Sequence, residues 1–126
     1  MFDVDGCLID SFAGTSLRPL AREILESLVA QGIDVVLWSA GGDEYAERRA
    51  REVGIDDLVV ACYSKERDEP DGRWRLDGVL ASHRAVTFVD DQPGDLPDGL
   101  HVIGVSPYLG DSPHDRGLST VLDLIG

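Results

Sequence analysis

The chain has 126 residues, 43% of them hydrophobic and 28% charged, a composition that indicates one globular domain and excludes a disordered chain. Its 11 basic and 24 acidic residues give a net charge of −13, which disfavours nucleic acids and anionic membrane surfaces as partners. No apolar run approaches the roughly 18 residues of a membrane span, and two cysteines without a signal peptide favour a reduced, cytoplasmic protein.

Predicted strands and helices alternate along the chain. Apolar runs of strand length lie at residues 1–4, 33–38, 58–62, 85–89 and 101–105, and helical patterns lie at residues 19–31, 44–53 and 117–125. This alternation predicts a parallel α/β sheet in one domain over residues 1–126. The runs VVLW and AVTFV are apolar on both faces, so we expect these two strands near the centre of a sheet that helices cover.

Sequence signals mark the ends of the two clearest helices. Pro19 opens the first and Gly32 follows its end, while Asp43 is the predicted N-cap of the second and Gly54 its stop. Residues 63–84 are polar and rich in turn residues, with only a weak helical pattern near their end. The sequence gives this segment no assignment.

Two aspartates stand close together at the first predicted strand. Asp3 and Asp5 point to the same face of an extended strand, because side chains at i and i+2 do so. At a separation of about 4 Å and an effective dielectric near 20, two such charges repel by on the order of 4 kcal/mol. We therefore expect a group bound between them. Only two residues precede Asp3, so a start of the chain upstream of Met1 stays open.

Polar groups also follow two later strands. The segment Ser39-Ala40-Gly41-Gly42 follows VVLW, and Asp90, Asp91 and, four residues further, Asp95 follow AVTFV. In open parallel sheets, ligands bind beyond the carboxyl ends of the strands, near the point where the strand order reverses. If these strands are neighbours, their carboxylates share one crevice, which requires a divalent cation, and oxygen ligands favour Mg²⁺ over zinc.

Candidate phosphate-binding groups accompany the carboxylates. Lys65 is the only lysine in the chain, and an ammonium group is a compact charge that can pair with a phosphate oxygen and an aspartate at once. Ser39 and the backbone N–H groups that follow it, beginning at Ala40, precede a predicted helix, where N–H groups bind anions.

These residues resemble the four motifs of the haloacid dehalogenase-like (HAD) phosphohydrolases. FDVDGCLID resembles the first motif, VVLWSAGG the second, Lys65 the third and VTFVDDQPGD the fourth, in the family's order over residues 2 to 95. The resemblance implies a Rossmann-like, doubly wound, mainly parallel sheet with helices on both faces. It also implies a Mg²⁺-dependent phosphomonoester hydrolase in which Asp3 is the nucleophile that forms an aspartyl-phosphate and Asp5 is the general acid and base.

The resemblance assigns roles to the other motif residues as well. Ser39, Ala40 and Lys65 would hold the phosphoryl oxygens. Mg²⁺ would be bound by Asp3, the backbone carbonyl of Asp5 and the fourth motif, where we prefer Asp91 to Asp90 as the direct ligand and expect Asp95 to orient these ligands.

The gaps between the motifs are too short for a cap domain, since only 25 residues separate Ser39 from Lys65. The resemblance therefore points to the capless branch of the family. Open sites of this branch act on phosphorylated proteins, small molecules or nucleic-acid ends, or are covered by a neighbouring subunit in a homo-oligomer. The acidic composition favours a protein or small-molecule monoester over a nucleic-acid end.

Two alternatives from other functional classes stay open. A phospho-accepting domain like the receivers of response regulators also combines Asp, Mg²⁺, Ser or Thr and Lys on a parallel sheet. Its paired acids follow the first strand, whereas here the adjacent acids come late, so the order disfavours this reading. A catalytically silent binding domain with the same fold is the second alternative, and the intact acidic residues argue against it.

Overall fold

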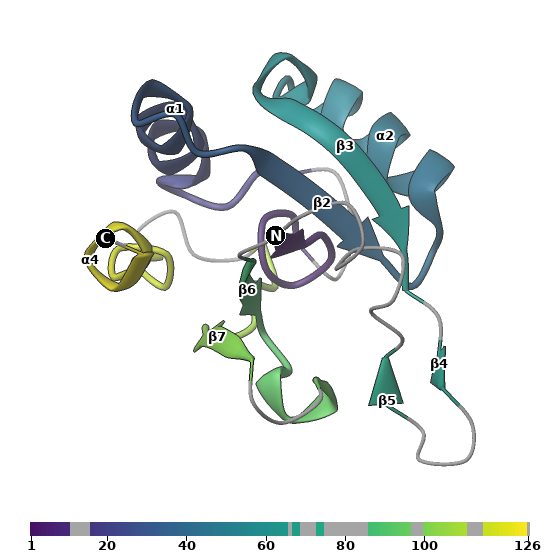
Figure 1. The fold of residues 1–126 in the computed structure, drawn as a ribbon. Coiled ribbons are helices and arrows are strands. Elements are labelled where there is room, and N and C mark those ends of the chain that lie inside the picture. Colours follow the sequence, from purple (N-terminus) through teal and green to yellow (C-terminus); the bar gives the residue numbers. More distant parts are fainter. Residues whose placement is uncertain are drawn as a thin grey trace.

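The computed structural model describes residues 1–10, 16–65, 67–68, 73–74, 86–96, 100–110 and 115–125. Five parallel strands form a sheet in the order β3-β2-β1-β6-β7 (Figure 1). These strands are β1 (Phe2–Asp3), β2 (Val35–Ser39), β3 (Val59–Ser64), β6 (Thr87–Asp90) and β7 (His101–Gly104). After β3, the short strands β4 (Arg67–Asp68) and β5 (Arg73–Trp74) form a separate antiparallel pair.

The strand order reverses at β1. The chain adds β2 and β3 on one side of β1 and later adds β6 and β7 on the other side. The neighbouring ends of β1 and β6 are therefore the position at which open α/β sheets bind ligands. The parallel α/β sheet is confirmed, and so is the central position of the strands that contain VVLW and AVTFV, since β2 and β6 both border β1.

Among the described residues, the helices are α1 (Ala21–Ala30), α2 (Asp43–Glu52) and α4 (Val121–Ile125), with short 3₁₀ helices η1 (Asp56–Leu58) and η2 (Pro93–Asp95). Buried residues of α1, α2 and α4 form one core with Val35 and Leu37 of β2. Val36 and Trp38 point to the opposite face and form a second core with Leu96, which follows η2. This alternation along β2 explains why the strand is apolar on both faces.

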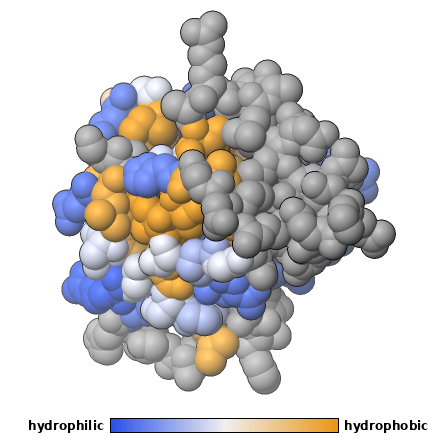
Figure 2. Space-filling model, turned by 60° about the horizontal axis from the view of Figure 1, so that its bottom comes forward, coloured by the Kyte–Doolittle hydropathy of each residue, from blue (hydrophilic) through white to orange (hydrophobic). Residues whose placement is uncertain are grey.

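Hydrophobic residues gather on one face of the molecule (Figure 2). Figure 2 brings the bottom of Figure 1, with η2 and β7, toward the viewer and shows hydrophobic residues gathered in one area there. The weak helical pattern near the end of residues 63–84 lies outside the described residues. Within the described ranges, none of the helices has the length and apolar character that crossing a membrane requires.

The ends of the helices agree with the sequence signals in part. Gly32 and Gly54 follow the ends of α1 and α2 with φ of +80° and +78°, as expected of helix-stopping glycines. The prediction that Asp43 is an N-cap is wrong, because Gly42 occupies that position with φ 108° and ψ 166°. The N–H of Asp43 instead donates to the hydroxyl of Ser64 at 2.9 Å. A side chain at the end of β3 therefore accepts one of the backbone N–H groups that have no partner within the first turn of α2.

Candidate active site

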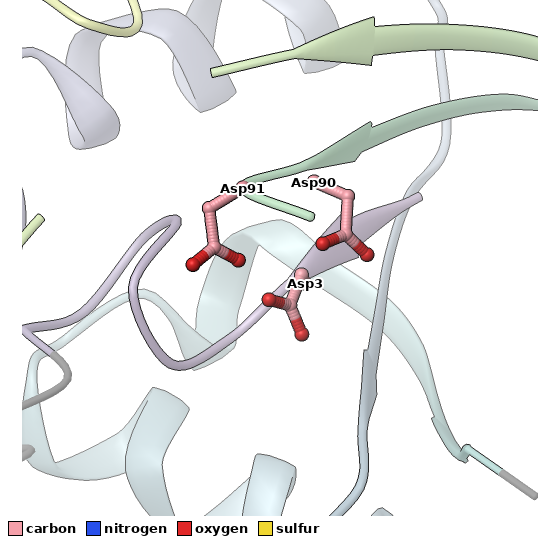
Figure 3. A group of neighbouring side chains, drawn as sticks. All are labelled: Asp3, Asp90 and Asp91. Carbon is pink, nitrogen blue, oxygen red and sulfur yellow. The ribbon is translucent and has the colours of Figure 1, made fainter. Parts of the chain in front are cut away.

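Three carboxylates meet where the strand order reverses. Asp3 ends β1, Asp90 ends β6 and Asp91 follows it, and one oxygen of each lies within 4.8 Å of the others. Figure 3 shows the three side chains directed into the same space beyond the strand ends. Asp3 is 8% exposed and Asp90 only 1%, so two of the three acids are taken almost completely out of water.

Lys65, directly after β3, places its ammonium group between two of these acids. Its Nζ lies 2.9 Å from Oδ1 of Asp3 and 3.0 Å from Oδ2 of Asp90. The ammonium also lies 4.7 Å from the centroid of a Trp38 ring, and the Lys65 N–H donates to the carbonyl of Ser39 at 2.8 Å. Burial lowers the pKa of Lys65, but the two carboxylates outweigh burial and raise it, so the side chain is charged at neutral pH.

One cation does not balance the three acids. The pKa of Asp3 is raised to about 8, first by burial and then by the charge of Asp90 and a hydrogen bond with Asp91, against the opposing effect of Lys65. Burial and repulsion between the carboxylates therefore disfavour the state in which all three acids are ionised. A divalent cation among these oxygens would compensate the negative charge that Lys65 leaves unbalanced. The donor set, made of carboxylate oxygens only, fits Mg²⁺ better than zinc.

Gly6 shapes the side of the cluster next to Asp91. Its φ of +80° lies in the left-handed region, and a Cβ at this position would lie only 2.5 Å from Oδ2 of Asp91. A glycine is therefore needed at this position of the D-x-D-G sequence, both for the backbone turn and for the close approach of the Asp91 carboxylate. The carbonyl of Gly6 accepts a hydrogen bond from the N–H of Tyr108 at 2.8 Å, which fixes the loop from the far side.

Ser39 ends β2 and is 2% exposed. Its hydroxyl oxygen accepts the N–H of Gly41 at 3.0 Å, and its carbonyl accepts the N–H of Gly42 at 3.1 Å. These bonds form the turn into α2 and leave Ala40 exposed. The hydroxyl hydrogen of Ser39 can still be donated, because the hydroxyl oxygen acts only as an acceptor in its bond with the Gly41 N–H.

Asp5 has a partner that sequence reasoning missed. The hydroxyl of Tyr45, in the first turn of α2, donates to Oδ1 of Asp5 at 2.8 Å. Burial raises the pKa of Tyr45 and the charge of Asp5 raises it further, so the hydroxyl keeps its proton. The sequence places Tyr45 in a predicted helix next to three arginines and offers no signal that it turns toward Asp5.

Sequence reasoning also missed Arg18, whose side chain is completely buried under the loop that follows β1. Its Nε lies 2.7 Å from Oδ1 of Asp115, and its NH1 makes long hydrogen bonds of 3.5 and 3.3 Å to the carbonyls of Gly6 and Cys7. This arginine connects the loop that carries Asp5 with the segment before α4. In the sequence, Arg18 directly precedes Pro19 at the predicted start of the first helix, and nothing there indicates that its side chain is buried.

The comparisons with known proteins agree with this geometry. The family model of the NLI interacting factor-like phosphatases matches residues 2–126. The chain belongs to this phosphatase family. The family is HAD-like and capless, so the resemblance seen in the four motifs is confirmed, and membership makes the chain a phosphatase that hydrolyses phosphate esters. Among curated proteins, none matches the chain.

The fold recurs in a solved structure. A crystal structure of an uncharacterized protein from Listeria monocytogenes serotype 4b is similar to this NLI interacting factor-like phosphatase with a TM-score of 0.65 and 16% sequence identity. The similarity covers 98% of this chain and 96% of the Listeria chain. At this level of identity the comparison supports the fold alone.

The structure of the phosphatase brings most of the predicted site residues together. Asp3, Asp90, Asp91 and Lys65 form one cluster, and Asp5 lies two residues beyond Asp3 with its carboxylate bound to the Tyr45 hydroxyl. Ser39 and Ala40 lie at the end of β2, next to β1. The predicted side-chain role of Asp95 lies outside the part of the chain that the structure describes.

Proposed function

We propose that this phosphatase is a Mg²⁺-dependent phosphomonoester hydrolase that acts through an aspartyl-phosphate on Asp3. The observation that supports the proposal best is the contact of Lys65 with Asp3 and Asp90 beside Asp91. This arrangement provides a nucleophilic carboxylate, acidic groups for a cation and a positive charge for a phosphoryl oxygen, all at the ligand-binding edge of the sheet.

The residues that would hold Mg²⁺ are Asp3, Asp91 and the backbone carbonyl of Asp5. Asp90 is the weaker candidate for a direct ligand, because its Oδ2 already accepts from Lys65 and its Oδ1 accepts the N–H of Gln92 at 2.9 Å. When bound, the cation supplies charge neutralisation between the carboxylates and the phosphoryl oxygens.

The protein's own groups perform two displacements at phosphorus. An oxygen of Asp3 attacks phosphorus, the bond from phosphorus to the substrate oxygen breaks, and Asp5 gives a proton to the departing alcohol. Asp5, now ionised, takes a proton from a water molecule that attacks the aspartyl-phosphate, which releases phosphate and restores Asp3. Acid and base catalysis of this kind contributes roughly 10² to 10⁴ in rate.

Lys65, Ser39 and the N–H of Ala40 are the groups proposed to hold the phosphoryl oxygens. Lys65 is already oriented by two carboxylates, and Ser39 is fixed by the turn into α2, so neither group needs to reorganise when a phosphate arrives. The substrate class that fits a capless site and a net charge of −13 is a phosphorylated protein or small molecule rather than a nucleic-acid end.

The test is hydrolysis of an aryl phosphate at neutral pH, with Mg²⁺, with EDTA and with the Asp3→Asn variant. We expect EDTA and Asp3→Asn each to abolish turnover, while circular dichroism shows a folded protein. Asp34→Asn is a matched control, because Asp34 is exposed and lies before β2 at the opposite end of that strand from Ser39. We expect its activity to equal that of the wild type.

Chemical trapping tests the intermediate directly. Borohydride reduces an acyl phosphate, so protein quenched during turnover should be modified at position 3 and nowhere else. Hydrolysis that continues in Asp3→Asn, or in EDTA, would contradict the proposed mechanism. A stable phosphate on Asp3 with no turnover would instead support the receiver-like alternative.

A further inference from the structure

Tyr45 connects the start of α2 with the loop that follows β1. Its hydroxyl oxygen lies 2.8 Å from Oδ1 of Asp5, 40 positions away in the sequence. α2 begins directly after the turn of Ser39 to Gly42, so the segment proposed to hold the phosphate also determines where Tyr45 lies. The contact therefore joins the group proposed as general acid to the phosphate-binding end of the site.

The ring of Tyr45 is held in place from several directions. The guanidinium carbons of Arg49 and Arg48 lie 5.1 and 5.6 Å from the ring centroid. Glu52 forms ion pairs with both arginines, at 2.8 Å from Arg49 and 3.6 Å from Arg48. A Cβ on Gly41 would lie 2.9 Å from the ring, so the ring fills the space next to this glycine. The hydroxyl therefore has a defined position before any substrate binds.

We propose that Tyr45 is a positioning residue for the general acid and base, an inference that rests on the proposed function. The hydroxyl holds Oδ1 of Asp5 and so fixes the rotation of the carboxyl group. Oδ2 is then the oxygen that carries the transferred proton. As the bond from phosphorus to the substrate oxygen breaks, that oxygen keeps the electron pair and takes the proton from Oδ2, while Tyr45 retains its own proton. A fixed donor removes the reorientation that proton transfer would otherwise require.

The dependence of rate on the leaving group separates this role from a structural one. Phenol is a much weaker acid than 4-nitrophenol, so phenyl phosphate needs protonation during bond breaking and 4-nitrophenyl phosphate needs it far less. For Tyr45→Phe we expect kcat/KM to fall about 10-fold with phenyl phosphate and less than about 3-fold with 4-nitrophenyl phosphate. A general disturbance of the site would lower both values by the same factor.

Tyr108→Phe is the matched control for the loss of a hydroxyl. Tyr108 is 5% exposed, and its ring centroid lies 5.6 Å from the guanidinium carbon of Arg18. We expect this variant to keep the wild-type ratio of the two kcat/KM values. Thermal unfolding of both variants shows whether each is folded at the assay temperature.

The outcomes distinguish this inference from the proposed function. Equal losses with both substrates, no loss with either, or faster hydrolysis in Tyr45→Phe would overturn the positioning role while Asp3→Asn remains inactive. Activity retained in Asp3→Asn, measured alongside, would overturn the proposed function itself and with it the inference on Tyr45. A selective loss with phenyl phosphate, together with an inactive Asp3→Asn, supports both.

Discussion

Gly6 and Gly32 have the same φ angle and different surroundings. Both have φ of +80°, where a residue with a Cβ costs roughly 1–2 kcal/mol. A Cβ at Gly32 meets no atom within 4 Å, whereas a Cβ at Gly6 would lie 2.5 Å from Oδ2 of Asp91. Replacing each glycine by alanine therefore separates backbone strain, which the two variants share, from displacement of Asp91, which only Gly6→Ala causes.

The size of the displacement follows from the geometry. Contacts of a Cβ below 3.0 Å essentially do not occur, so Asp91 has to retreat by at least 0.5 Å, the difference between 3.0 and 2.5 Å. A carboxylate can rotate aside at little cost in stability. Mg²⁺ binds oxygens at about 2.0–2.1 Å in strict octahedral geometry, so a ligand that retreats by this distance binds it poorly. Disturbed support of metal ligands typically costs about 10- to 100-fold in affinity.

Urea unfolding and a Mg²⁺ titration of aryl phosphate hydrolysis measure the two effects. We expect both variants to lose about 1–2 kcal/mol in the free energy of unfolding. Only Gly6→Ala should raise the Mg²⁺ concentration for half-maximal activity, by about 10-fold or more. The reasoning is refuted if Gly6→Ala has the Mg²⁺ dependence of Gly32→Ala. A much larger loss of stability in Gly6→Ala would show that Asp91 cannot move aside as argued.

Two further predictions concern the charges around the site. Lys65→Met should lower aryl phosphate hydrolysis at least about 100-fold in steady-state kinetics. Lys65→Arg should not restore the rate, because the planar guanidinium group of arginine cannot replace the compact ammonium group held between Asp3 and Asp90. A largely active Lys65→Arg variant would contradict this prediction. Burial raises the pKa of Asp115, but hydrogen bonds from Arg18 and the Gly117 N–H outweigh burial and lower it below 3.8. The ionised group therefore stabilises the fold above about pH 4, and this contribution disappears as the pH falls through the folded pKa. Asp115→Asn should lower the free energy of unfolding by about 3 kcal/mol near neutral pH. Urea unfolding at acid pH should show a smaller difference between this variant and the wild type. A difference that does not change with pH would argue against the ion pair of Arg18 with Asp115.

The sequence was sufficient for the sheet and for most of the candidate site. Parallel strands place their carboxyl ends at one edge, so locating Asp3 and Asp90 at strand ends was enough to predict that they meet, with Ser39 at the end of the neighbouring strand. Lys65 was identified as the only lysine, although its surroundings gave no readable structure. Its position became clear only in the structure, where it directly follows β3.

The parts that the sequence did not reveal depend on contacts between distant residues. Asp43 has the chemistry of an N-cap, yet the hydroxyl of Ser64 accepts its N–H and the backbone of Gly42 takes the cap position. Tyr45 resembles any aromatic residue in an amphipathic helix until its hydroxyl is seen at Asp5. Local patterns describe propensity and periodicity, whereas these interactions depend on how α2 lies against its neighbours.

The loop that carries the proposed acid depends on residues that take no part in the chemistry. Placing the guanidinium of Arg18 out of water is unfavourable, and an apolar pair of similar volume would stabilise the fold as well. Apolar residues, however, could not bind the carbonyls of Gly6 and Cys7 and the carboxylate of Asp115 at the same time, as the several donors of one guanidinium do. Since Gly6 is also the residue whose missing Cβ admits Asp91, a shift of this loop would move the carboxylate cluster. The geometry of the site therefore depends on the segment before α4 as well as on the strand ends that supply its side chains.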